Sequence, residues 1–220
     1  MKKIYLIRHA QSVANAMPST GEPVQYCNAD IPITELGKRQ AHELAIWLDT
    51  HLDGVPDGVF VSPYLRTQET AQPFLAKINA TATMLDELHE FNYLSFDNIK
   101  GKTFAELKPL SDAFWAKHDA HYQDGADSDS FASFYEQINQ IRAYFQELAD
   151  GTYVVFGHGF WIGLFLWQMI GRGGINMSKF REFELLVRPK NTEVFLWQIV
   201  DGMNAVAKVR NLRGDDRVVL

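Results

Sequence analysis

Two short apolar runs, each ending beside a histidine, constrain this chain more than any other feature. Residues 4–7, Ile-Tyr-Leu-Ile, are followed after one arginine by His9. Far downstream, residues 153–156, Tyr-Val-Val-Phe, are followed after one glycine by His158. Short runs of this composition are typical of buried strands. Because open α/β sheets bind ligands at the carboxyl ends of their strands, we predict that both histidines lie in one active site.

The rest of the chain alternates between helix and strand signals. Thr34 is a predicted N-cap, and Ser62-Pro63 is typical of a helix start, with serine at the cap and proline at the first helical position. The final segment has the alternation of a hairpin around Asp201-Gly202. The predicted helices cover residues 34–48 and 62–79, residues from 131 up to Gly151, and residues from 160 onward; the predicted strands cover 59–61, 192–200 and 205–210. This order predicts an α/β fold, a three-layer α/β/α sandwich around a mostly parallel central sheet.

The domain organisation follows from length and composition. A chain of 220 residues fits one domain, and it contains neither an internal repeat nor a low-complexity linker. Residues 11–30 are rich in Pro, Gly, Ser and Asn and are predicted to form a loop with little regular structure. Residues from about 90 to 130 lack a clean period and are crowded with aromatic, His and Asp residues. We therefore expect one domain over 1–220 with a cap-like insertion at about 90–130.

Charge and cysteine content exclude several classes of function. The formal net charge of −6 argues against a general nucleic-acid binder, and it requires local positive charge wherever an anion binds. Cys27 is the single cysteine, so an internal disulfide and a multi-cysteine metal site are excluded. The apolar stretch over residues 160–170 is too short to span a bilayer, and no signal peptide is visible. We expect a soluble cytoplasmic protein without a membrane or nucleic-acid partner.

Four side chains could meet in one crevice above the sheet. Arg8 and His9 follow one strand, His158 follows another, and Arg66 lies one turn into the helix that starts at Ser62. Each alone would be read as a surface or structural residue, but together they favour an oxyanion, because guanidinium groups bind phosphate bidentately. Histidine can be the nucleophile of phosphoryl transfer, with arginines stabilising the charge that a metal would otherwise stabilise.

The chain resembles the histidine phosphatase superfamily, in the branch that includes the cofactor-dependent phosphoglycerate mutases. Four motifs and one asparagine carry the resemblance in order: LIRHAQSVAN at residues 6–15, PITELGKRQA at 32–41, SPYLRTQETA at 62–71, GHG at 157–159, and Asn191 before the final hairpin. The resemblance covers almost the whole chain.

The resemblance implies a role for each matching position. His9 would become phosphorylated, and Glu87 of the segment Leu85-Asp86-Glu87 would be the general acid, with Asp86 and Glu90 as alternative donors. The implied catalytic residues are Arg8, His9, Arg66, Glu87 and His158, and the implied substrate-binding residues are Arg8, Asn15, Arg66, His158 and Gly159.

Three departures from the family pattern stand out. Ala10 replaces the usual glycine, which requires a backbone without positive φ. Glu69 stands where the family has glutamine. After Glu87 the usual glycine and tryptophan are absent, and a G-x-T-x-x-E element appears displaced at residues 101–106. The cover of the site is therefore expected to differ from that of the best-known members.

These observations predict a metal-independent phosphoric monoester hydrolase of the histidine acid phosphatase type, acting through a phosphohistidine on His9. We expect no cofactor, no metal and a small phosphorylated molecule as partner; the oligomeric state, including a dimer, stays open. His118 and His121 have a spacing found at metal sites, but a third ligand is not evident. Two alternatives remain: a phosphoglycerate mutase, disfavoured by the absence of that group's longer insertions, and a catalytically silent phospho-ligand binder.

Overall fold

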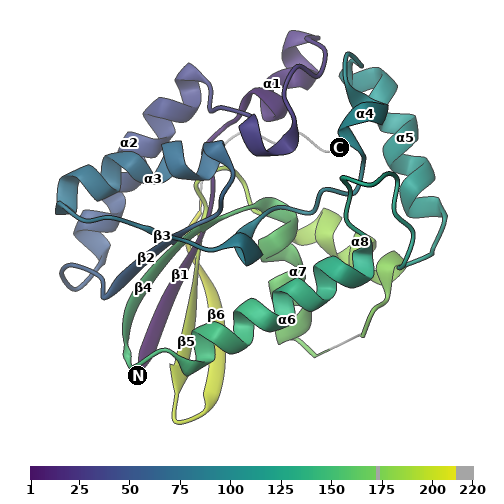
Figure 1. The fold of residues 1–220 in the computed structure, drawn as a ribbon. Helices are drawn as coiled ribbons and strands as arrows, with labels where there is room; N and C mark the ends of the chain where they lie inside the picture. The colour runs from purple at the N-terminus through teal and green to yellow at the C-terminus, as the bar shows by residue number, and fades with distance from the viewer. Residues whose placement is uncertain (172–173, 212–220) are drawn as a thin grey trace.

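A six-stranded sheet forms the centre of the protein, and its strands lie in the order β3-β2-β4-β1-β5-β6 (Figure 1). The computed structural model describes residues 1–171 and 174–211. The first four strands in this order are parallel to one another, whereas β5 pairs antiparallel with both of its neighbours, β1 and β6. The strands are β1 (Lys2–Arg8), β2 (Gly58–Val61), β3 (Thr83–Met84), β4 (Gly151–Gly157), β5 (Val194–Val200) and β6 (Met203–Arg210).

Helices cover both faces of the sheet, which confirms the predicted three-layer α/β architecture. Along β1, Tyr5 and Ile7 pack with residues of α2 and α3, whereas Ile4 and Leu6 pack with residues of α6 and α7. A strand segment buried on both faces must be apolar, as residues 4–7 of β1 and 153–156 of β4 are. The helices are α1 (Val13–Thr20), α2 (Glu35–His51), α3 (Leu65–Ile78), α4 (Phe96–Ile99), α5 (Phe104–Ala116), α6 (Phe131–Glu147), α7 (Gly159–Met169) and α8 (Met177–Val187), with short 3-10 turns η1 (Asn28–Asp30) and η2 (Asp86–Leu88).

Several helix ends lie where capping chemistry predicts them. The Thr34 hydroxyl accepts a hydrogen bond from the Gly37 amide at 3.0 Å, which confirms Thr34 as the N-cap of α2. Helix α3 ends at Asn79 in the left-handed conformation, close to its predicted end. The final hairpin is also confirmed, with Asp201 and Gly202 at positive φ in its turn.

The prediction of an irregular loop over residues 11–30 was wrong. Ser12 and Asn15 form a reciprocal capping box, and Gly21 ends α1 in the left-handed conformation. Pro18 lies within the helix without preventing it. Local capping thus outweighs a composition that is typical of loops.

Three other boundaries differ from the prediction. Helix α3 begins at Leu65 and not at Ser62, because the Ser62 hydroxyl accepts from the Tyr64 amide in a turn that precedes the helix. Helix α6 ends at Glu147, and Gly151 is instead the first residue of β4, where a Cβ would lie 2.6 Å from the Asp57 carboxylate.

The segment over residues 90–130 is more helical than its sequence period indicates. Thr103 and Glu106 form a capping box that begins α5. Helices α1, α4 and α5 lie beyond the carboxyl ends of the parallel strands (Figure 1). They therefore enclose the side of the sheet where the histidine-bearing strands end. Helix α8 had no counterpart in the predicted elements.

Within residues 1–171 and 174–211, each helix is too short or too polar to cross a membrane.

Candidate active site

The two histidines meet because their strands are direct neighbours. Arg8 of β1 pairs in register with Gly157 of β4, and the His9 amide donates to the Gly157 carbonyl at 3.0 Å. The imidazole rings of His9 and His158 lie edge to face with centroids 5.3 Å apart. Both side chains are buried, with 3% and 0% of their surface exposed.

The hydrogen bonds of His9 show which of its two ring nitrogens carries the proton. Arg66 Nε lies 3.2 Å from His9 Nε2, and a guanidinium can only donate, so Nε2 carries the lone pair. On the other side of the ring, Nδ1 lies 2.7 Å from the Ala10 carbonyl, which can only accept, so Nδ1 carries the proton. His9 therefore presents an unprotonated Nε2 to Arg66.

Arg66 is held from several sides in the first turn of α3. Its Nη1 donates to the Asn28 carbonyl at 2.5 Å, and its Nη2 donates to the Asn28 side-chain oxygen at 3.0 Å. The Tyr64 ring lies under the guanidinium at 4.9 Å. Burial lowers the pKa of Arg66 to about 10, so the group remains a cation near neutral pH.

Arg8 comes from the end of β1 and approaches the start of α7. Its Nη1 donates to the Pro189 carbonyl at 2.5 Å. A Cβ at Gly159 would lie 3.4 Å from Arg8 Nε, so glycine allows the guanidinium to approach the helix backbone closely. Burial, together with the charge of Arg188, lowers the pKa of Arg8 to about 10.

Two buried polar atoms at this site have no hydrogen-bond partner among the described residues. They are Arg8 Nε and His158 Nδ1. His158 Nε2 is occupied, since it lies 2.8 Å from the Ser62 hydroxyl. Buried polar atoms are rarely left without a partner, and those that are need an explanation such as an oxyanion that binds there.

Both imidazoles are kept neutral by their surroundings. Burial, and then the positive charges of Arg66 and Arg8, hold the pKa of His9 well below its usual value. Burial and Arg66 act in the same direction on the pKa of His158. A neutral imidazole is the form that can attack phosphorus.

These depressed pKa values predict a loss of stability in acid. The unfolded chain binds protons on both histidines as the pH falls below about 6.5, whereas the folded chain does not. The free energy of unfolding should therefore fall by up to about 1.4 kcal/mol per pH unit for each histidine below that pH. We expect His158→Gln to reduce this dependence, measured by urea denaturation between pH 7.5 and 5; an unchanged slope would contradict the assignment.

Asn15 and Asn191, which lie near opposite ends of the sequence, are hydrogen-bonded to each other next to the His9 backbone. The Asn191 side-chain amide donates to the His9 carbonyl and to the Asn15 side-chain oxygen, each at 2.9 Å. The same Asn15 oxygen accepts from the Ser12 amide at 3.2 Å. Asn15, in the first turn of α1, is therefore linked to the His9 backbone through Asn191.

Two of the departures from the family pattern have local explanations. Ala10 is buried and is not among the described residues with positive φ, so its Cβ is tolerated. Its amide donates to the Thr70 hydroxyl at 2.9 Å. Glu69 accepts from the Ile33 amide at 2.7 Å, a bond that a carboxylate makes as well as a glutamine does.

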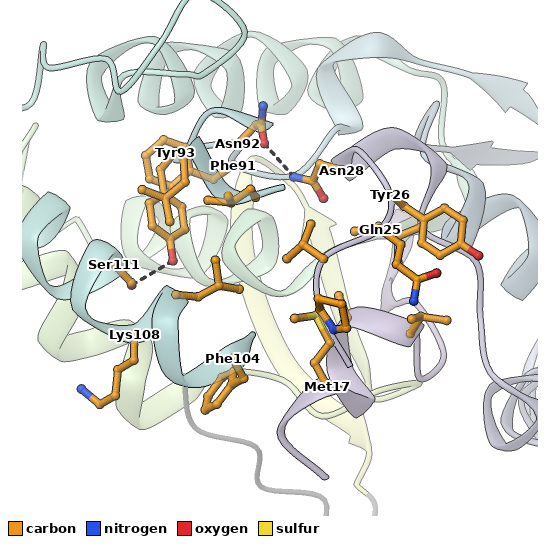
Figure 2. A pocket seen from close by; sticks show the side chains of 18 residues that line it. Met17, Gln25, Tyr26, Asn28, Phe91, Asn92, Tyr93, Phe104, Lys108 and Ser111 are labelled. Carbon is orange, nitrogen blue, oxygen red and sulfur yellow. Dashed lines mark hydrogen bonds between the residues drawn. The ribbon is translucent and has the colours of Figure 1, made fainter. Parts of the chain in front are cut away.

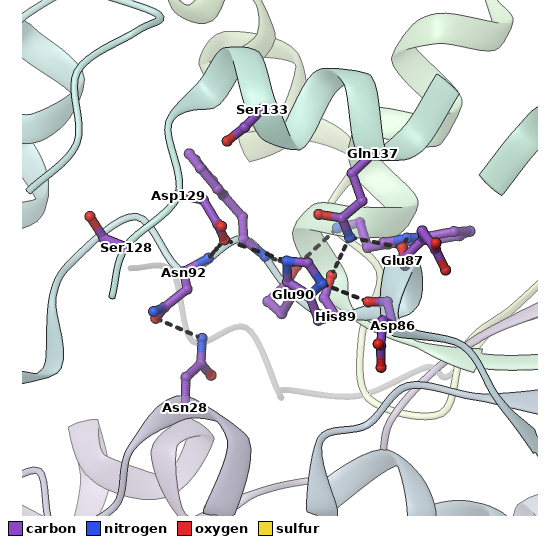
Figure 3. A network of polar contacts seen from close by, with 12 residues as sticks. Asn28, Asp86, Glu87, His89, Glu90, Asn92, Ser128, Asp129, Ser133 and Gln137 are labelled. Carbon is purple, nitrogen blue, oxygen red and sulfur yellow. Dashed lines mark hydrogen bonds and ion pairs between the residues drawn. The ribbon is translucent and has the colours of Figure 1, made fainter. Parts of the chain in front are cut away.

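The structure does not bring Glu87 to the histidines. Its side chain is exposed and lines a surface cleft together with Asp86, His89 and Gln137. In Figure 3 its carboxylate points away from Glu90. Only its backbone enters the core region, where the Glu87 carbonyl accepts from Gln137 Nε2 at 2.8 Å and from Trp161 Nε1 at 2.9 Å.

Glu90, one of the two alternative donors, lies near the arginines of the site, since burial lowers the pKa of both Arg8 and Arg66 and the Glu90 charge counteracts this lowering. Its carboxylate accepts from the backbone amides of Phe160 and Trp161, in the first turn of α7, at 3.1 and 3.0 Å. It also accepts from the Phe91 amide at 3.1 Å. Burial raises the pKa of Glu90, although the Arg66 charge and the three amides act in the opposite direction.

The Glu90 carboxylate lies at the start of the helix that follows His158. His158 is the N-cap of the helix whose first amides hold the Glu90 carboxylate. A sequence signal for this residue exists, because Leu88-His89-Glu90 repeats the L-x-E pattern of Leu85-Asp86-Glu87 three residues later. Asp86, the other alternative, is exposed beside Glu87.

His89 is a further polar residue at this edge that the sequence did not single out (Figure 3). Its Nε2 lies 3.7 Å from the Asp129 carboxylate, and its Nδ1 lies 2.6 Å from the Asp86 carbonyl. Burial lowers the pKa of His89, but Asp129 and the Asp86 carbonyl outweigh this effect and raise it above the usual value. Its ring lies 6.1 Å from that of Tyr64, so it borders the site.

Comparison with known proteins agrees with this geometry. The sequence profile of the histidine phosphatase superfamily (branch 1) matches residues 4–211. The chain belongs to this superfamily. The same fold recurs at low sequence identity in solved structures.

Two of those structures share the fold over nearly the whole of both chains. A putative α-ribazole-5'-P phosphatase from Escherichia coli superposes with a TM-score of 0.73 at 20% identity, over 96% of this chain and 98% of that one. A phosphoserine phosphatase from Entamoeba histolytica in complex with 3-phosphoglyceric acid superposes with a TM-score of 0.71 at 20% identity, over 97% and 98%. At such identities the likeness concerns the fold alone.

One curated relative matches over a shorter stretch. The transcription factor tau 55 kDa subunit of Saccharomyces cerevisiae is 39% identical over 77 residues. The match covers 34% of this chain and only 17% of that protein's length. It relates part of the histidine phosphatase chain to a part of a much longer protein.

Proposed function

We propose that this histidine phosphatase superfamily member hydrolyses phosphomonoesters through a phosphohistidine on His9. The observation that carries the proposal is the orientation of His9, whose unprotonated Nε2 faces the Arg66 guanidinium. Two further nitrogens, Arg8 Nε and His158 Nδ1, are buried nearby without a partner among the described residues. This set can bind the equatorial oxygens of a phosphoryl group around a nucleophile.

The proposed reaction has two balanced steps. In the first, the lone pair of His9 Nε2 forms a bond to phosphorus while the ester P–O bond breaks, and Glu90 gives its proton to the departing oxygen. In the second, Glu90 takes a proton from a water molecule whose oxygen attacks phosphorus. The P–N bond then breaks, which releases inorganic phosphate and restores neutral His9.

Positive charge for these steps comes from the chain itself. Arg8 and Arg66 remain cations near neutral pH and are partly desolvated, which strengthens their attraction to the phosphoryl oxygens. The raised pKa of Glu90 increases the fraction that is protonated and able to act as an acid. We therefore propose a reaction that does not require a metal ion.

Turnover in chelator combined with trapping of the intermediate tests this proposal. We expect p-nitrophenyl phosphate to be hydrolysed at an undiminished rate in EDTA, and a brief incubation with ³²P-labelled substrate to leave acid-labile, base-stable label on the protein. Label without net hydrolysis, together with rapid interconversion of phosphoglycerates, would replace the proposal by a mutase. Phosphate binding with neither label nor turnover would indicate a silent binder.

A further inference from the structure

An apolar cavity of about 200 Å³ lies between α1, the loop that precedes η1, and α5 (Figure 2). Met17 of α1 lines one wall, and Tyr93, Phe104 and Leu107 line another. Most of its other lining residues are aliphatic or aromatic as well. Concave sites that are mainly apolar and contain a few polar groups are typical of small-molecule binding sites.

The cavity is linked to the proposed phosphoryl site through Asn28. Asn28 lines the cavity, and its two oxygen atoms accept hydrogen bonds from Nη1 and Nη2 of Arg66. Phe91, directly after Glu90, is part of the wall as well. Asn28 Nδ2 donates to Asn92 Oδ1 at 3.2 Å, so these two amides connect η1 with the segment that follows Glu90 (Figures 2 and 3). A leaving group that extends from the phosphoryl site past Asn28 would therefore reach the cavity.

The cavity offers little that could hold an ionised group. Among its described lining residues the one charged side chain is Lys108, whose Nζ donates to Asp112 at 2.7 Å and points away from the cavity in Figure 2. The hydroxyl groups of Tyr93 and Ser111 lie 2.9 Å apart and satisfy each other. Burying a carboxylate or an ammonium group there without a partner would be unfavourable.

We propose that the substrates are monophosphate esters of apolar alcohols or phenols, whose alkyl or aryl group occupies this cavity. The proposal rests on the proposed function, because it assigns the leaving group of the same site. It predicts poor use of small phosphate esters that carry a carboxylate or an amino group near the phosphate, because the apolar walls would desolvate those charges.

Binding of phosphonates that cannot be hydrolysed tests this without turnover. We expect hexylphosphonate to bind at least about 15-fold more tightly than methylphosphonate by titration calorimetry. This ratio requires burial of only two methylene groups at about 0.8 kcal/mol each, with 1.4 kcal/mol equal to a factor of ten. Equal affinities for the two phosphonates would overturn the proposal.

Two alanine-to-phenylalanine variants provide a matched pair. Ala14 lines the cavity, so Ala14→Phe should narrow it and lower the hexyl-to-methyl affinity ratio at least fivefold. Ala105 is exposed on α5 and does not line the cavity, so Ala105→Phe should leave the ratio unchanged. A ratio that stays the same in Ala14→Phe, with the variant folded by circular dichroism, would overturn the assignment of the cavity.

Turnover separates the failure of this inference from that of the proposed function. If the protein hydrolyses phosphomonoesters but kcat/KM for hexyl phosphate does not exceed that for phosphoserine, the cavity assignment is wrong and the phosphatase proposal stands. If the phosphonate preference is present and no ester is hydrolysed, the cavity binds apolar phosphoryl ligands and the proposed function fails.

Discussion

Replacement of His9 by alanine should lower phosphomonoester hydrolysis by roughly 10⁴- to 10⁶-fold, the range found when a covalent nucleophile is removed. The arginines and His158 would still bind the phosphoryl group, but no nitrogen would remain in line with the ester bond. The loss should appear in kcat more than in KM, because the nucleophile forms its bond in the transition state. Steady-state kinetics with p-nitrophenyl phosphate measure both.

The control for this variant is another histidine. His121 is exposed and is not part of the site, so His121→Ala should keep wild-type kcat. The His9→Ala protein should also retain a native circular dichroism spectrum and give no labelled phosphoprotein. More than a tenth of wild-type kcat in folded His9→Ala would exclude His9 as the nucleophile.

Glu90→Gln is expected to cost about 10²- to 10⁴-fold in kcat, the usual contribution of a general acid. Glutamine can still accept hydrogen bonds at the start of α7 but cannot deliver a proton to the leaving oxygen. The loss should be larger for an alkyl phosphate than for p-nitrophenyl phosphate, because nitrophenolate leaves readily without a proton. This dependence on the leaving group distinguishes acid catalysis from a general structural defect.

Glu87→Gln is the matched control for the same substitution three residues away. The Glu87 side chain is exposed outside the site, so this variant should stay within about twofold of wild type for both esters. A large loss in Glu87→Gln, with Glu90→Gln nearly unaffected, would return the acid role to Glu87. The melting temperatures of both variants show whether either change disturbs the fold.

The order of strands and helices could be predicted where burial leaves a simple pattern. Residues 4–7 and 153–156 are apolar because helices cover both faces of the sheet. Their apolar composition was therefore enough to predict that they form buried strands. Helix α1 could not be predicted from composition, because its formation depends on a reciprocal cap between Ser12 and Asn15. The meeting of the histidines followed from the strand ends, and the geometry reproduces it.

The L-x-E pattern alone could not show which glutamate lies close to the histidine-bearing strands, since both Glu87 and Glu90 satisfy it. The 3-10 turn η2 ends at Leu88, and His89 then adopts an extended conformation with φ −63° and ψ 154°. If the 3-10 helix continued, Glu87 and Glu90 would lie on the same side of it, because it has three residues per turn. The extended backbone at His89 separates them. The deciding information is therefore a backbone turn and the free amides of α7, which lies some 70 residues later.

The central position of β1 has a consequence for how the protein reaches its native state during synthesis. Its partners β4 and β5 begin at Gly151 and Val194, about 150 residues or more after β1 starts at Lys2. At about 5 to 20 residues per second, the ribosome needs roughly 7 to 30 seconds to supply the first of them. The apolar β1 strand must stay unpaired until then, so the nascent chain is expected to need protection from aggregation, and fragments that stop before β4 should neither fold around His9 nor bind phosphate.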